Sequence, residues 1–269
     1  MTTTKVPSAD ELARAALQTE DNDERARVLA KLHAMGSHEV FSLAVEFVSS
    51  SVVAERRLGL DILAQLGFEE QRGTGRWPFY DSSLPLLRVC LAASEKEVVA
   101  AAAYAFLHLG VQDVLPDLIA LTEHPDGGCR EAVVCALGTS NDVAATDCLL
   151  RLMSDAEPSV RNWASFAVAQ SGRDDALVRD ALAASVRDAD EEVRIEALLG
   201  LARRRDPRCV PALVDELSGD VLSSLAIEAA AAIGDPALSP LLERWMEAID
   251  ADDEFAPALV AALEATSIH

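Results

Sequence analysis

Aromatic residues and long apolar runs are both scarce in this chain. Only 12 of its 269 residues are Phe, Trp or Tyr, while apolar residues in total make up half of the chain. No apolar run approaches the ~18 residues that a membrane-spanning helix needs, and the first residues lack the apolar core of a secretion signal. We therefore expect no membrane partner and a cytoplasmic location.

Basic residues are also few. Lys and Arg together number 23 against 45 acids, which gives a formal net charge of −22. Such a charge repels nucleic acid, so a nucleic-acid partner is not expected, whereas a protein with a basic or mixed-charge surface is. The five cysteines show no CxxC spacing and are expected to be reduced thiols, several of them small core residues.

A short frame recurs seven times. Three positions after a marker residue stands a small residue. Another small or apolar residue stands six positions after the marker, and a helix-ending residue stands eleven positions after it. The markers are Arg25, Arg56, Val99, Arg130, Arg161, Arg194 and Ser223. Successive spacings are 31, 43, 31, 31, 33 and 29 residues. A period near 31 predicts stacked supersecondary units and not a globular domain around one active site.

Within each copy, small residues recur at helical spacing on one face, as Ala164 and Ala167 do in one copy and Ala197 and Gly200 in the next. Their size lets neighbouring helices approach closely. The closing residue of six copies is Gly or Asn, which tolerates the left-handed conformation that ends a helix; the exception is Arg205. We expect Gly or Asn closures at Gly36, Gly67, Gly110, Asn141, Gly172 and Gly234.

A second helix is predicted after each closure. Four of these helices have Pro at an equivalent early place, which suits a first turn: Pro85, Pro116, Pro211 and Pro240. Each unit is therefore helix A, a tight turn and helix B. Residues 1–20 are expected to form an N-terminal capping helix opened by a capping box at Ser8 and Glu11, residues 21–251 the array, and residues 252–269 a C-terminal capping helix with Pro257 in its first turn.

The frame D-x-x-x-x-V-R-x-x-A-x-x-A-L-x-x-L-G resembles HEAT repeats, and its short period is most similar to the bilin-lyase-type subgroup. Asp155, Val160, Arg161, Ala164 and Gly172 carry the frame best. The resemblance implies an all-α, right-handed α-solenoid of about seven helix pairs. It also implies a ladder of Asp–Arg contacts between adjacent repeats, interrupted at Val99 and Ser223, which replace the Arg. Tetratricopeptide and ankyrin arrays lack support, because their signature residues are absent.

The 43-residue spacing marks an insertion at residues 68–83, which holds four of the 12 aromatics. Insertions in repeat proteins map to loops on one face, often the binding face. Arg, Trp and Tyr are enriched at interface hot spots. The hypothetical protein-binding residues are Arg76, Trp77, Phe79 and Tyr80. The alternative is that these aromatics pack against their own repeat.

A dense basic run comprises Arg203, Arg204, Arg205 and Arg208. It has the chemistry to grip a carboxylate or phosphate, or it pairs with nearby acids in a solvated turn. The His38–Glu39 pair resembles one of the several pairs by which deoxyhypusine hydroxylase holds iron, but a di-iron site needs more ligands. No catalytic, cofactor-binding or metal-binding residue is predicted.

The function expected from the sequence is therefore a non-catalytic protein–protein interaction scaffold or adaptor. The acidic surface of the B helices is a second expected contact, beside the insertion. The alternative, which follows from the resemblance alone, is a bilin-lyase-like or other cofactor-handling enzyme. A structural module of a larger complex is a third possibility.

Overall fold

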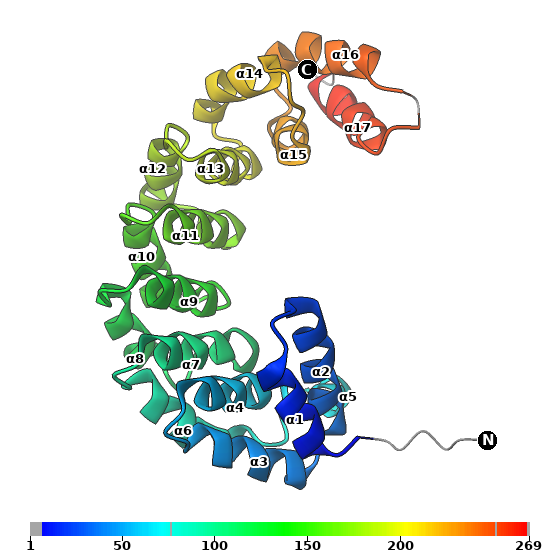
Figure 1. Cartoon of the computed structure of the whole chain (residues 1–269). Coiled ribbons are helices and arrows are strands. Elements are labelled where there is room, and N and C mark those ends of the chain that lie inside the picture. Colours follow the sequence, from blue (N-terminus) through cyan, green and yellow to red (C-terminus); the bar gives the residue numbers. More distant parts are fainter. Residues whose placement is uncertain (1–6, 76, 251, 268–269) are drawn as a thin grey trace, which may run out of the picture. The chain divides into compact units, whose positions relative to one another are not determined.

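In the computed structural model, which describes residues 7–75, 77–250 and 252–267, the chain is all-helical, with no strand among those residues. It divides into two compact units, unit 1 (residues 1–140) and unit 2 (residues 141–269). The helices are helix pairs of the predicted HEAT-like kind (Figure 1). The boundary falls between helix A and helix B of the fourth repeat.

The helices of unit 1 follow the frame from the first marker to the fourth. They are α1 (Ala9–Gln18), α2 (Asn22–Met35), α3 (His38–Val48), α4 (Val53–Gln65), α5 (Phe68–Thr74), α6 (Tyr80–Leu91), α7 (Lys96–Leu109), α8 (Leu115–Ala120) with the 3-10 turn η1 (Leu121–Glu123), and α9 (Gly127–Leu137). The A helices α4, α7 and α9 pack side by side in one layer, and α6 and α8 lie against α7 and α9 in the other (Figure 1).

Unit 2 repeats this arrangement. Its helices are α10 (Val143–Leu152), α11 (Pro158–Gln170), α12 (Ala176–Ser185), α13 (Glu191–Arg203), η2 (Pro207–Cys209), α14 (Val210–Ser218), α15 (Ser224–Ile233), η3 (Pro236–Leu238), α16 (Ser239–Ala248) and α17 (Ala256–Thr266). In Figure 1, α11, α13, α15 and α17 succeed one another in the A layer, and α10, α12, α14 and α16 form the B layer.

Small residues of the frame let the layers close, as predicted. Ala164 and Ala197 are fully buried. A Cβ on Gly200 of α13 would lie 2.9 Å from the Ala169 Cβ of α11 and 2.9 Å from a methyl carbon of Leu182 in α12. Because real Cβ atoms do not approach so closely, Gly200 is where the three helices come nearest to one another.

The turns agree with the frame in part. Gly36, Gly67 and Gly234 adopt the left-handed conformation, with φ of 53°, 79° and 64°. Gly172 and Asn141 do not, because α11 and α9 end before them, at Gln170 and Leu137. Arg205 was expected to break the rule, yet it takes a φ of 51° itself.

The helix starts also follow the sequence, with one error. Pro116, Pro211, Pro240 and Pro257 occupy first turns. The prediction for Pro85 is wrong: α6 begins at Tyr80, so Pro85 lies inside the helix. The end of the insertion supplies the added turn. At the N-terminus, the Ser8 hydroxyl accepts from the Glu11 amide while the Glu11 carboxylate accepts from the Ser8 amide, which is the predicted capping box.

Candidate functional site

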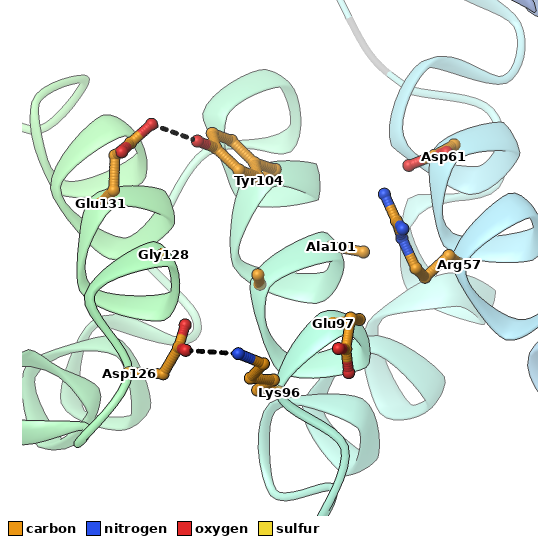
Figure 2. A pocket seen from close by; sticks show the side chains of 10 residues that line it. Arg57, Asp61, Lys96, Glu97, Ala101, Tyr104, Asp126, Gly128 and Glu131 are labelled. Carbon is orange, nitrogen blue, oxygen red and sulfur yellow. Dashed lines mark hydrogen bonds and ion pairs between the residues drawn. The ribbon is translucent and has the colours of Figure 1, made fainter. Parts of the chain in front are cut away.

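An open hollow of about 280 Å³ lies on the A layer of unit 1, lined by side chains of α4, α7 and α9 (Figure 2). Two interactions cross from α7 to the segment that begins α9. The Lys96 ammonium lies 2.9 Å from a carboxylate oxygen of Asp126, and the Tyr104 hydroxyl donates to Glu131 at 3.0 Å. These two contacts border the hollow on its α9 side.

On the α4 side of the hollow, one of two charged side chains has no ion-pair partner among the described residues. Asp61 pairs with Arg25 at 2.8 Å, whereas Arg57, which extends from α4 beside Asp61 (Figure 2), makes no ion pair with any residue that the structure describes. The ammonium of Lys96 and the carboxylate of Glu97 add one charge of each sign. The hollow is thus a mixed-charge surface around small alanines, which suits polar contact with another molecule.

Two groups at this hollow, the Tyr104 phenol that lines it and the neighbouring Cys135 thiol, are held in their neutral forms. Burial raises the pKa of the Tyr104 phenol, and the neighbouring Cys135 and Glu131 raise it further. Burial likewise raises the pKa of Cys135 to about 11. A thiol with that pKa is protonated near pH 7 and is a poor nucleophile, so Tyr104 and Cys135 act here as hydrogen-bonding and packing groups.

The insertion is partly helical and packs on its own unit. Residues 68–74 form α5 instead of an open loop. The Phe79 ring stacks on Phe41 with ring centroids 4.9 Å apart, and His38 meets its edge at 5.2 Å. His38, for which the sequence predicts no metal role, packs against an aromatic ring in this structure.

The other predicted binding residues of the insertion also make internal contacts. The Trp77 indole donates to the carbonyl oxygen of His108 at 3.2 Å, and the Tyr80 hydroxyl donates to Asp113 at 2.7 Å. Trp77, Phe79 and Tyr80 are each half-buried, and each keeps some surface open. Arg76 lies outside the described residues. The structure brings three of the four residues together on α3, α7 and the α7–α8 turn.

The arginines of the basic run in unit 2 bond mainly to other groups of this chain. The Arg204 side chain is only 6% exposed. Its guanidinium donates to the carbonyl oxygens of Val168, Ala169, Ser171 and Arg173, where α11 ends. A helix end leaves its last carbonyls without partners, and Arg204 satisfies several of them at once.

The remaining arginines of this run pair with acids or lie exposed. Arg203 bridges Gln170 and Glu228 at 2.7 Å each. Arg208 contacts Asp206 and Asp180 at 2.7 Å. The Asp206 carboxylate, which is buried, also accepts from Arg179, and hydrogen bonding to Arg208 is the main reason why its pKa falls to about 2. Contacts within the chain therefore account for the positions of Arg203, Arg204 and Arg208 without a bound anion.

A surface that the sequence did not single out lies on α11. Trp163 and Phe166 are 42% and 39% exposed, and their rings meet edge to face with centroids 5.8 Å apart. They stand at the positions two and five residues after the marker Arg161, where the next copy has Glu196 and Leu199. The signal that could have found them is the frame itself, since aromatics at these positions replace smaller or charged residues of other copies.

Carboxylates of α13 lie next to the helix that carries this aromatic pair. Glu192 accepts from the Asn162 amide nitrogen at 2.8 Å, which joins α13 to α11. Glu196 stands one turn further along α13, and one of its carboxylate oxygens is buried without a hydrogen-bond partner among the described residues. Burial raises its pKa, which Glu228 and Glu192 also raise.

The predicted Asp–Arg ladder is present where the frame is most regular. The Arg161 guanidinium makes a two-bond contact with Asp188 of the next repeat, at 2.8 Å for each bond. Arg161 also donates to the carbonyl oxygens of Asp155 and Ala156 in its own turn. Where Val99 replaces the Arg, Lys96 reaches Asp126 of the next repeat instead.

The cysteine thiols agree with the sequence prediction of free thiols, several of them in the core. All five cysteines are free, and all but Cys135 are buried. In the described part of the chain, no group of three metal-ligating side chains comes together. Nor does any described helix combine the length and apolar character that crossing a bilayer requires.

The family model for HEAT repeats matches residues 83–169, which cover α7 to α10 and most of α6 and α11. That segment is similar to an array of HEAT repeats. The rest of the chain continues the same frame and the same helix pairs on both sides of the match. The resemblance seen in the sequence is therefore confirmed as a HEAT-type architecture.

Protein YibA of Escherichia coli K12 is 36% identical to this chain over 130 residues, which are 48% of this chain and 46% of YibA. YibA of strain O157:H7 matches equally. The chain thus spans about half the length of these relatives in the sequence match. In three dimensions, the crystal structure of YibA matches 96% of this chain and 93% of its own, with a TM-score of 0.74 and 27% identity.

Two further solved structures resemble the fold alone. The complex of CpcE and CpcF of phycocyanin lyase from Nostoc has a TM-score of 0.50 at 18% identity, over 97% of this chain and 96% of the matched one. An engineered protein has a TM-score of 0.56 at 15% identity, over 97% and 78%.

Proposed function

We propose that this chain is a non-catalytic scaffold or adaptor that binds another protein through the A layers of its repeats. The observation that carries the proposal is the exposure of aromatic side chains on these layers: Tyr104 in unit 1, and Trp163 and Phe166 in unit 2. Aromatic side chains provide much of the binding energy in protein interfaces when a partner covers them.

Charge supports a basic or mixed-charge partner. The net charge is −22, and carboxylates stand next to the exposed aromatics in both units, as Glu131 does beside Tyr104 and Glu196 on the helix next to Trp163. Opposite potentials raise the rate of encounter and suppress wrong partners. The insertion residues Arg76, Trp77, Phe79 and Tyr80 remain a proposed second contact, for which the partial exposure of the latter three leaves room.

The scaffold proposal is tested by capture with matched variants. The A-layer variant replaces Tyr104, Trp163 and Phe166 by Ser. The control replaces Val143 and Leu177, two B-layer residues that are each 63% exposed, by Ser. Wild type should retain a protein at fixed stoichiometry from lysate of the native host. The A-layer variant should lose that protein, and the B-layer control should keep it.

Equal retention by both variants would contradict the A-layer proposal, provided that circular dichroism melts show both to be folded. A variant in which Arg76 and Trp77 are both replaced by Ser, and which keeps Phe79 and its stack on Phe41, tests the insertion separately. Loss of the same partner by this variant would support a contact role of the insertion, and full retention would remove that role.

The second candidate is a cofactor-handling enzyme of the bilin-lyase type. The feature that favours it is likeness of fold to the CpcE and CpcF subunits of phycocyanin lyase, together with an unpaired Arg57 in the hollow on α4, α7 and α9, which has the charge to meet a propionate. Titration with a linear tetrapyrrole tests it. A saturable change in the visible spectrum that Arg57→Gln abolishes would favour the enzyme over the scaffold.

A further inference from the structure

The surface between α11 and α13 brings aromatic rings and acceptors together. Trp163 and Phe166 are exposed on α11, and their rings are in edge-to-face contact. On α13, Glu192 and Glu196 lie four residues apart and therefore share one helix face. The bond from Asn162 to Glu192 shows that this face meets the α11 surface on which Asn162 and Phe166 lie, again four residues apart.

Two acceptor atoms of this surface lack a donor among the described residues. One carboxylate oxygen of Glu196 and the amide oxygen of Asn162 are buried and have no hydrogen-bond partner among the described residues. Both atoms accept hydrogen bonds and cannot satisfy each other. A buried acceptor without a donor destabilises the fold, so a ligand that brings several donors to this place recovers that lost free energy.

The charge at this surface points the same way. Glu228 and Glu192 both disfavour the charged form of Glu196, and the cation that offsets them, Arg203, is already engaged by Gln170 and Glu228. An additional cation is therefore favoured here. Trp and Phe faces also attract a cation, and a guanidinium stacks on them more readily than an ammonium does.

We propose that the surface formed by Asn162, Trp163, Phe166, Glu192 and Glu196 binds an arginine side chain from a basic, extended segment of a partner protein. The guanidinium lies against the exposed aromatic rings and donates to Glu196 and Asn162. Its planar fork supplies five donors, which matches two orphaned acceptors better than a single ammonium does. This inference rests on the proposed scaffold function and names the chemistry of the partner.

The experiment uses the full chain and a fluorescein-labelled peptide in which arginine alternates with glycine. Its binding is followed by anisotropy at near-physiological salt. The same peptide with citrulline in place of arginine removes the charge and keeps the shape, and a lysine peptide tests the planar fork. We expect the arginine peptide to bind best, the lysine peptide more weakly and the citrulline peptide not measurably.

Two variants locate the site. Glu196→Gln should weaken binding of the arginine peptide roughly tenfold, because it removes a charge-assisted hydrogen bond. Glu191→Gln, on the same helix, removes the same charge from an exposed residue outside this surface and should change binding less than about twofold. In an NMR titration, the indole N–H resonance of Trp163, assigned with Trp163→Phe, should shift, whereas those of Trp77 and Trp245 should not.

Equal weakening by Glu191→Gln and Glu196→Gln would overturn the inference, since it would reveal attraction to the overall acidity. Equal binding of the citrulline peptide would overturn it too, as would self-association in sedimentation that Trp163→Ala abolishes, because a second copy would then occupy the surface. Capture of a partner that depends on the A layer but not on Glu196 would leave the scaffold function intact and overturn only the arginine site.

Discussion

The insertion before α6 and the regular helix α11 differ in a way that reverses the expectation from sequence. The insertion breaks the period, yet Trp77 and Tyr80 donate hydrogen bonds within unit 1 and Phe79 stacks on Phe41. Helix α11 follows the period closely, yet it exposes Trp163 and Phe166. Residues that break a repeat must find packing of their own, whereas a regular frame fixes the core and leaves the remaining positions free to vary.

The basic run of unit 2, like the insertion, makes contacts within its own unit. Arg204 completes the end of α11, and Arg208 neutralises Asp206. Both irregular segments, the aromatic insertion and the basic run, therefore contribute contacts that stabilise the fold. Four experiments, ordered by expected effect, test this contrast between irregular segments that hold the fold and a regular helix that offers a surface.

Arg204→Ala should produce the largest loss, about 3 kcal/mol in the free energy of unfolding, because it leaves several buried carbonyl oxygens at the end of α11 without donors. Arg203→Ala, in the same run, removes an exposed ion pair and should cost less than about 1 kcal/mol. Urea unfolding measures both. Similar small losses would show that the basic run is dispensable for folding.

Phe79→Ala should cost about 2 kcal/mol, since it removes a half-buried ring that stacks on Phe41. Val89→Ala on the following helix α6, where the side chain is 72% exposed, is the control and should be nearly neutral. The readout is again urea unfolding. If Phe79→Ala were neutral, the insertion would not be packed as described and its role as a binding segment would gain support.

Asp206→Asn should cost about 2 kcal/mol near pH 7 and progressively less in acid. The pKa of Asp206 is about 2 in the folded chain, below the ~3.9 of an unfolded aspartate. Its contribution is therefore fully present above about pH 4 and is lost as the pH falls towards 2. Asn keeps the hydrogen bond that caps η2. A difference between wild type and variant that did not shrink from pH 6 to pH 3 would contradict this assignment.

Replacing Trp163 and Phe166 together by Ala should have the smallest effect on stability, about 1 kcal/mol, because their exposed fractions of 42% and 39% leave them at the surface and outside the core. The neighbouring substitution Ala164→Leu, at a fully buried frame position, should cost about 1–3 kcal/mol by overpacking. Thermal melts compare the two. A large loss in the aromatic variant would mean that the pair holds α11 in place and is not a free surface.

Much of the fold could be predicted because the frame carries it redundantly. The buried alanines, the left-handed Gly36 and Gly234, and the Arg161–Asp188 contact all follow from local spacing. The placement of Pro85 could not be predicted, since it depends on how the insertion re-enters the repeat. The exposure of Trp163 does not follow from residue type, which suggests burial for a large aromatic; only its frame position, held by Glu196 in the next copy, indicates it.

The sequence by itself determined the helix pairs, their period and the acidic charge, because helix propensity, capping and small-residue spacing act over a few residues at a time. Only the tertiary structure decided which distinctive residues are available to a partner. Whether Trp77 or Arg204 faces solvent depends on neighbours 31 to 36 residues away in the chain, such as the carbonyls to which Arg204 donates. The repeat period thus predicts the fold, whereas packing between repeats decides which residues the proposed binding surface exposes.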